Sequence, residues 1–85
     1  MIIQLREDLG IRNIKDFFSQ IKTAVKDEGE ITLDFSKMRR LDLSVIQVIM
    51  AANRELLKKG RKIILKSASK DVKKQLFICG FAKRL

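Results

Sequence analysis

Apolar and polar residues follow two different periods along the chain, and these periods predict its secondary structure. Three short runs have strand character: residues 2–6, 31–35 and 61–66. In the second run Ile31, Leu33 and Phe35 alternate with polar residues, as in a strand with one buried face. The third run has a continuous apolar centre, which predicts a strand covered on both faces. Residues 9–12 are expected to add a further short strand.

Between and after these strands, apolar residues recur at the spacing of amphipathic helices. Each of the three predicted helices opens on a capping residue and closes on a glycine. These pairs are Asn13 and Gly29, Ser44 and Gly60, and Ser69 and Gly80. Gln47 stands three residues after Ser44, so the second helix start also fits a capping box. Phe81 would follow the last glycine as a hydrophobic contact, and residues 82–85 would fray or form a short edge strand.

The alternation of strands and helices predicts an α/β fold with a mainly parallel sheet and right-handed crossovers. The chain has 85 residues, no proline, and no repeat or linker-like run, so residues 1–85 are expected to form one domain. We find no apolar stretch long enough for a signal peptide or a membrane span. Together with a single cysteine, Cys79, this predicts a reducing, cytoplasmic location. Cys79 lies in an apolar run and is expected to be a buried packing residue.

The formal net charge of +9 favours acidic partners in general. Most of the lysines have the spacing of solvated helix faces. The chain has no tryptophan or tyrosine, and its five phenylalanines do not interleave with the basic residues. A stacking surface for single-stranded nucleic acid is therefore poorly supported, and we expect no nucleic-acid partner.

Several kinds of catalytic chemistry are excluded or disfavoured by the residues present. There is no histidine, so no Ser-His or Cys-His pair can form. The four glycines are scattered and make no phosphate-cradling loop. Asp34 and Asp42 are the only carboxylate pair near a strand end, which makes a weak candidate for a metal site. We expect no enzyme activity and no cofactor.

The junction between the strand at 31–35 and the helix predicted from Ser44 is the best candidate for a binding site. Binding sites in open α/β sheets gather beyond the carboxyl ends of strands. Arg39 and Arg40 bring positive charge into the loop, and Asp42 flanks the helix start. The backbone N–H groups at a helix start suit an anion, or a serine that gains and loses a phosphate. The simpler alternative is that Ser44 only caps a helix.

Four segments carry a resemblance to a known family: Asp34-Phe-Ser36, Leu41-Asp-Leu-Ser44, Lys59-Gly-Arg-Lys-Ile-Ile-Leu65, and residues 69–81 with Gly80-Phe81. In this order and spacing, over roughly residues 10–81, they resemble the STAS domain of anti-sigma factor antagonists and sulfate-transporter tails. The resemblance implies a small mixed, mainly parallel sheet with helices packed chiefly on one side. It also implies a bacterial regulatory domain.

The resemblance further implies partner switching. In the family, the serine or threonine matching Ser44 is phosphorylated by a partner kinase, often the anti-sigma factor itself. The unmodified domain binds that partner and releases a sigma factor. The residues expected to contact the partner are Asp34, Ser36, Arg39, Arg40, Asp42, Leu43, Val45 and Gln47.

A second reading is a non-phosphorylated adaptor. Leu43 and Val45 stand where the family pattern has a small polar residue and a glycine, and the chain is basic. The stretch from Leu41 to Gln47 looks close to the short single-domain members of the family. Such proteins serve as subunits of lipid-transport ATPase complexes or are encoded among chemotaxis components. On either reading we expect a monomer or weak dimer.

Overall fold

The computed structural model describes residues 1–7, 9–10, 12–27 and 29–80, and it has three strands and three helices in alternation. The elements are β1 (Ile2–Gln4), α1 (Ile14–Lys26), β2 (Ile31–Asp34), α2 (Leu43–Lys58), β3 (Ile63–Lys66) and α3 (Lys70–Ile78). The predicted α/β fold is therefore confirmed. The strand expected at 9–12 is wrong for its described residues, Leu9, Gly10 and Arg12, none of which lies in a strand. The roles expected for Phe81 and for residues 82–85 lie outside the described residues.

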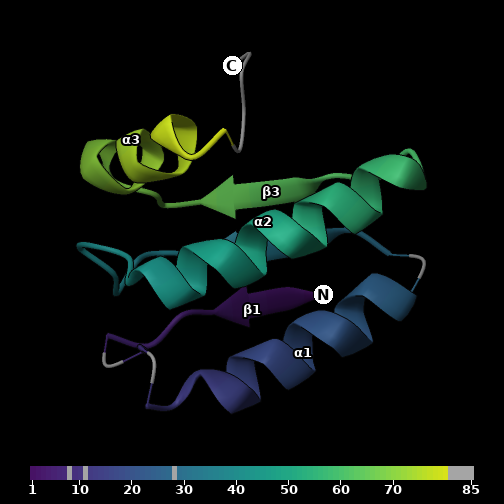
Figure 1. The fold of residues 1–85 in the computed structure, drawn as a ribbon, viewed down its shortest axis with the longest axis horizontal. Helices are drawn as coiled ribbons and strands as arrows, with labels where there is room; N and C mark the ends of the chain where they lie inside the picture. The colour runs from purple at the N-terminus through teal and green to yellow at the C-terminus, as the bar shows by residue number, and fades with distance from the viewer. Residues whose placement is uncertain (8, 11, 28, 81–85) are drawn as a thin grey trace.

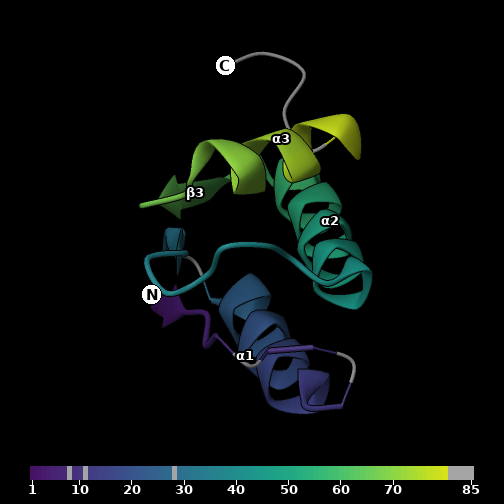
Figure 2. The ribbon, with the colours of Figure 1, turned by 90° about the vertical axis from the view of Figure 1, so that its left-hand side faces the viewer.

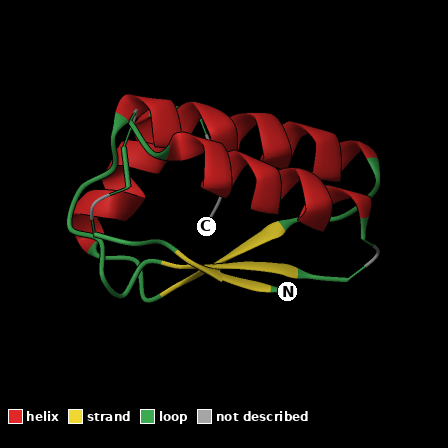
Figure 3. Cartoon of the chain, turned by 90° about the horizontal axis from the view of Figure 1, so that it is seen from below, coloured by secondary structure: helices red, strands yellow, loops and turns green. Residues whose placement is uncertain are grey.

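The described strands form one parallel sheet in the order β1-β2-β3, which confirms the mainly parallel prediction. Helices lie on one side of this sheet, with α1 and α2 side by side across it (Figures 1 and 3). The expectation that residues 61–66 form a strand covered on both faces is wrong. On β3, Ile63 is buried, Ile64 is half-buried and Lys66 is exposed, because no described helix covers the other face of the sheet.

The core fills the space between the sheet and the helices. Leu33 of the central strand is 0% exposed, and it belongs to the same core cluster as residues at helical spacing on α2. Three of these, Val45, Ile49 and Leu56, are also 0% exposed. Each such side chain contributes roughly 1.5–3 kcal/mol by leaving water. The packing therefore fixes α2 and, with it, the junction at its start.

The two ends of α1 differ from the sequence prediction. Asn13 makes no side-chain cap bond to the helix, and its Oδ1 accepts a hydrogen bond from the Gly10 N–H instead. The helix ends at Lys26, before Gly29, whose backbone does not adopt the left-handed conformation. Gly60 and Gly80 do adopt it, with φ of 70° and 89°, and confirm the other two glycine stops. Ser69 caps α3 as predicted, accepting from the Val72 N–H at 3.1 Å.

Cys79 is exposed, so the prediction that it packs in the core is wrong. Helical spacing places it on the same face as the buried Val72 and Leu76. However, α3 ends at Ile78 and the chain turns at Gly80, so Cys79 lies beyond the last turn that contacts the core.

Candidate functional site

The loop between β2 and α2 is held by three buried side chains at every third position. Phe35, Met38 and Leu41 are 1%, 5% and 6% exposed. The Phe35 N–H donates to the Lys66 carbonyl at 2.9 Å, and the Met38 N–H donates to the Phe35 carbonyl at 2.9 Å. The polar residues between these anchors are exposed: Ser36, Lys37, Arg39 and Arg40. The loop therefore presents charge on a fixed backbone.

Asp34 supports this loop from within. Its side chain is 9% exposed and accepts a hydrogen bond from the Ser36 N–H at 2.9 Å. That backbone bond, followed by the bond from the Ser36 side chain, holds the pKa of Asp34 below its ordinary value. Lys66 and Lys37 lower the pKa further, while burial works in the opposite direction. The Asp34 carboxylate thus shapes the turn at the end of β2.

The start of α2 differs from the prediction by two residues. Asp42, and not Ser44, is the N-cap: it is extended (φ −70°, ψ 147°) and its Oδ1 accepts from the Ser44 N–H at 3.1 Å. The helix therefore begins at Leu43, and the predicted Ser44–Gln47 capping box is wrong. Aspartate and serine are similarly good caps. Here the carbonyl of Asp42 also accepts the first helical bonds, from Val45 and Ile46.

Ser44 is half-buried in the first turn of α2, and its hydroxyl donates to Asp42 Oδ1 at 3.0 Å. The helix dipole favours negative charge at this position. The loop before α1 approaches the same carboxylate, because a Cβ on Gly10 would lie 3.4 Å from Asp42 Oδ2. The Asp42 carboxylate therefore caps α2, accepts a hydrogen bond from the Ser44 hydroxyl, and lies close to the loop before α1.

Gln75 of α3 is a residue of the site that the sequence analysis missed. Its Oε1 accepts from the Leu41 N–H at 2.9 Å, and its Nε2 donates to the Leu41 carbonyl at 3.1 Å. The side-chain amide thus pairs with a backbone amide 34 residues earlier in the chain. Figures 1 and 2 show α3 at the end of the molecule where this loop enters α2. Nothing in the local sequence around Gln75 indicates such a contact.

The residues predicted to contact a partner fall into two groups. Six are exposed at the β2–α2 junction, and we call them the junction surface: Ser36, Arg39, Arg40, Asp42, Leu43 and Gln47. Asp34 lies beneath them. Val45 is 0% exposed and belongs to the core, so its side chain is not available to contact a partner at the surface. We therefore leave Val45 out of the proposed surface.

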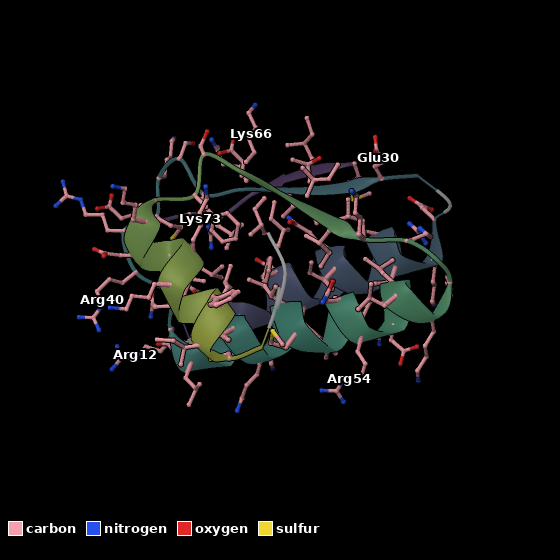
Figure 4. The ribbon with its side chains drawn as sticks, turned by 90° about the horizontal axis from the view of Figure 1, so that it is seen from above. Arg12, Glu30, Arg40, Arg54, Lys66 and Lys73 are labelled. Atoms are coloured by element: carbon pink, nitrogen blue, oxygen red, sulfur yellow. The ribbon has the colours of Figure 1, made fainter. Side chains whose placement is uncertain are left out.

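The junction surface continues onto α3 through a shallow cavity of about 310 Å³, which is lined by Arg40, Asp71, Lys74, Gln75 and Ile78. Ile78 is 72% exposed and Leu43 is 63% exposed. Arg40 lies beside α3 (Figure 4), with whose residues it lines this cavity. Exposed apolar side chains and basic groups therefore occur together at this end of the molecule.

The weak metal candidate gains no support. Within the described part of the chain, no three His, Cys, Asp or Glu side chains are grouped as metal ligands would be. Asp34 and Asp42 each accept hydrogen bonds from neighbouring backbone N–H groups. Across the same residues, every helix is too short or too polar to cross a bilayer.

The whole chain, residues 1–85, matches the family model described as "Mlab, STAS domain". The chain therefore belongs to the STAS family, as its motifs and fold predicted. Domains of this family generally act as regulatory or interaction modules and not as catalysts. No curated protein matches the chain.

Proposed function

We propose that residues 1–85 form a single interaction domain that binds a protein partner through the junction surface. The observation that carries this proposal is Leu43, whose side chain is 63% exposed at the first residue of α2. The backbone beneath it is fixed by the Asp42 cap and the Gln75 contact. Arg39 and Arg40 are exposed in the same surface, and arginine is enriched among the residues that dominate binding at protein interfaces.

The charge around Leu43 supports an acidic partner face. Arg39 and Arg40 are exposed and precede the helix, and Lys74 borders the adjoining cavity. Basic groups at the rim of an interface accelerate association with an acidic partner and select against basic ones. A kinase-type anti-sigma factor or an ATPase subunit is the partner class we propose, in the cytoplasm of a bacterium.

Ser44, which is half-buried beside the junction surface, is the proposed switch. Phosphorylation would add about −1.5 to −2 charges at neutral pH. The phosphoryl group would replace the hydroxyl proton that now bonds Asp42 and would place a second anion beside that carboxylate. It would also reverse the local charge that attracts an acidic partner. The unmodified domain is therefore the binding form.

The test is recovery of partner from the native cells by tagged wild-type protein and three variants. We expect Ser44→Asp to lower partner recovery, whereas Ser44→Ala retains it. Ser19→Asp is the matched control, because Ser19 is exposed on α1 and away from the junction. Equal recovery by Ser44→Asp and Ser19→Asp would refute the switch.

The non-phosphorylated adaptor is the second candidate, and the exposed Leu43 favours it because an apolar anchor suits constitutive docking. Intact-mass analysis of the native protein, with fragmentation to locate any modified residue, separates the two. A phosphate on Ser44 supports switching. A chain that stays unmodified across growth conditions and co-purifies stoichiometrically with its partner supports the adaptor.

A further inference from the structure

A groove between α1 and α2 forms a second surface feature, apart from the junction surface. It has a volume of about 240 Å³ and is lined by Phe18, Ile21, Lys22, Val25, Lys26, Val48, Ala51, Ala52 and Glu55. Figure 3 shows the two helices side by side over one face of the sheet. The groove therefore lies along the middle of α2, not at its start.

The groove is apolar because the core residues Ile21 and Ala52 line it together with more exposed apolar residues. Phe17 is buried, but the adjacent Phe18 is 46% exposed. On the opposite wall, Ala51 and Ala52 are small and leave the space open. Lys22 Nζ lies 5.3 Å from the centroid of the Phe18 ring, which is within range of a cation–π contact. An exposed aromatic ring beside a hollow of small residues is a suitable receptor for apolar side chains.

The charge available at the rim is positive. Glu55 already pairs with Lys58, with Nζ and Oε1 3.4 Å apart. Within the described part of the chain, Lys22 and Lys26 form no ion pair. The whole chain carries +9, so a second copy would bring like charge to this rim. Charge complementarity therefore selects an acidic occupant.

The walls of the groove select a helix. The backbone groups of α1 and α2 are paired within their own helices, so the groove offers no free strand edge to an extended peptide. A helix satisfies its own backbone and inserts only side chains. The lined part of α1, residues 18–26, spans about 12 Å, which is a little over two turns. This length fits apolar anchors at positions i, i+3 or i+4, and i+7 of the occupant.

We propose that the α1–α2 groove is a docking site for an acidic amphipathic helix of a partner protein. Its apolar face fills the space beside Phe18 and Ala51, and its carboxylates pair with Lys22 and Lys26. This site is independent of the junction surface and of any modification at Ser44.

The experiment is a peptide titration of the isotope-labelled protein, followed by backbone amide NMR. The probe is a synthetic helical peptide about four turns long, with leucines at i, i+3, i+4 and i+7 and mainly glutamates elsewhere. A second peptide keeps the leucines and carries lysines in place of the glutamates. We expect the acidic peptide to shift amides at Phe18 and Ala51 and to bind at least about tenfold more tightly than the basic one.

Matched variants locate the binding. Ala51→Glu fills the groove and should weaken peptide binding about tenfold. Thr23→Glu is the control, because it makes the same charge change at an exposed position of α1 that does not line the groove. It should change the affinity less than about twofold. Lys22→Glu, on the α1 wall of the groove, should also weaken binding of the acidic peptide, because it replaces a positive charge with a negative one. Absence of shifts at the groove, or equal affinity for both peptides, would overturn the proposal. Self-association of the wild-type protein that Ala51→Glu abolishes would also overturn it, by assigning the groove to a second copy.

Discussion

The two ends of α2 carry similar residues in different surroundings. Leu43 at the start is 63% exposed, and Leu57 near the end is 60% exposed. Each end is also tied to another helix by polar side chains, and at the later end the Lys59 Nζ donates to the Val25 carbonyl at 3.4 Å. Gln75 joins the start to α3 by pairing with the backbone of Leu41, and Arg61 joins the end to α1.

The two ends differ in which backbone groups these side chains bind. The guanidinium of Arg61 donates to the carbonyls of Ala24, Val25 and Gly29, which are the last carbonyls of α1 and the loop after it. Carbonyls at a helix end have no partner within the helix, so this arginine supplies one. The end of α2 is thus a structural joint, beside a shallow cavity of about 480 Å³ that Leu57, Gly60 and Lys62 help to line. The start of α2 is held by the Gln75 pairing and the Asp42 cap, and it presents the Ser44 hydroxyl and two exposed arginines beside Leu43. Neither a held backbone nor an exposed leucine distinguishes a binding site from a structural joint, because both ends of α2 have them. What sets the start apart is a serine in the first turn of a helix, next to two exposed arginines.

The largest effect we expect is from Arg61→Ala. Loss of several charge-assisted hydrogen bonds should lower the free energy of unfolding by about 2–3 kcal/mol. Lys62→Ala, at the exposed neighbouring position, should change it by less than about 0.5 kcal/mol. Urea denaturation measures both. Equal effects of the two variants would show that the end of α2 is not the joint described.

Gln75→Ala should have the next largest effect, a loss of about 1–2 kcal/mol, because it leaves the backbone N–H and carbonyl of the buried Leu41 without this partner. Gln75→Glu keeps the acceptor for the Leu41 N–H but removes the donor to its carbonyl. Amide hydrogen exchange at Leu41 should therefore be accelerated strongly by alanine and weakly by glutamate. Unchanged exchange in both variants would remove α3 from the support of the junction.

Asp42→Ala should lower the free energy of unfolding by about 1 kcal/mol, as expected for loss of an N-cap. Asp42→Ser should recover most of that loss, because serine also caps well. If Ser44→Ala destabilised the protein more than Asp42→Ala did, the assignment of the cap to Asp42 would be contradicted. Thermal unfolding followed by circular dichroism makes this comparison.

The smallest effect concerns pH and Asp34. Its pKa is lowered in the folded state, so its carboxylate stabilises the fold at pH values above the ordinary pKa of about 4. That contribution should decline as the pH falls through the lowered pKa. Asp34→Asn keeps an acceptor for the Ser36 N–H but cannot titrate, so it should flatten this part of the stability profile. An unchanged acid profile in the variant would show that Asp34 does not contribute.

The sequence predicted the strands, the helices and two of the glycine stops because each rests on local periodicity and backbone preference. The α2 cap was misplaced because Asp42 and Ser44 are both good caps two residues apart, and only the backbone shows which one is extended. Gly29 was misread because Arg61, over thirty residues away in sequence, satisfies the end of α1 instead. Long-range contacts of this kind, including that of Gln75, leave no local pattern.

Within the predicted site, Val45 has the helical spacing of Ile49 and Leu56 and lies with them in the core, where it is 0% exposed. Val45 was predicted to contact a partner because of its position in the family motif, not because of the apolar periodicity of the helix. The polar loop positions Ser36, Arg39 and Arg40 are exposed, whereas Phe35, Met38 and Leu41 pack in the core; contact with a partner stays a prediction.

The most direct test of the account compares the two exposed leucines of α2. Tagged Leu43→Asp and Leu57→Asp would be purified from the native cells beside the wild-type protein, with the partner quantified by mass spectrometry and folding checked by circular dichroism. We predict that Leu43→Asp stays folded and loses the partner, whereas Leu57→Asp retains it. Equal recovery of the partner by both variants, or its loss only with Leu57→Asp, would contradict the assignment of binding to the junction surface.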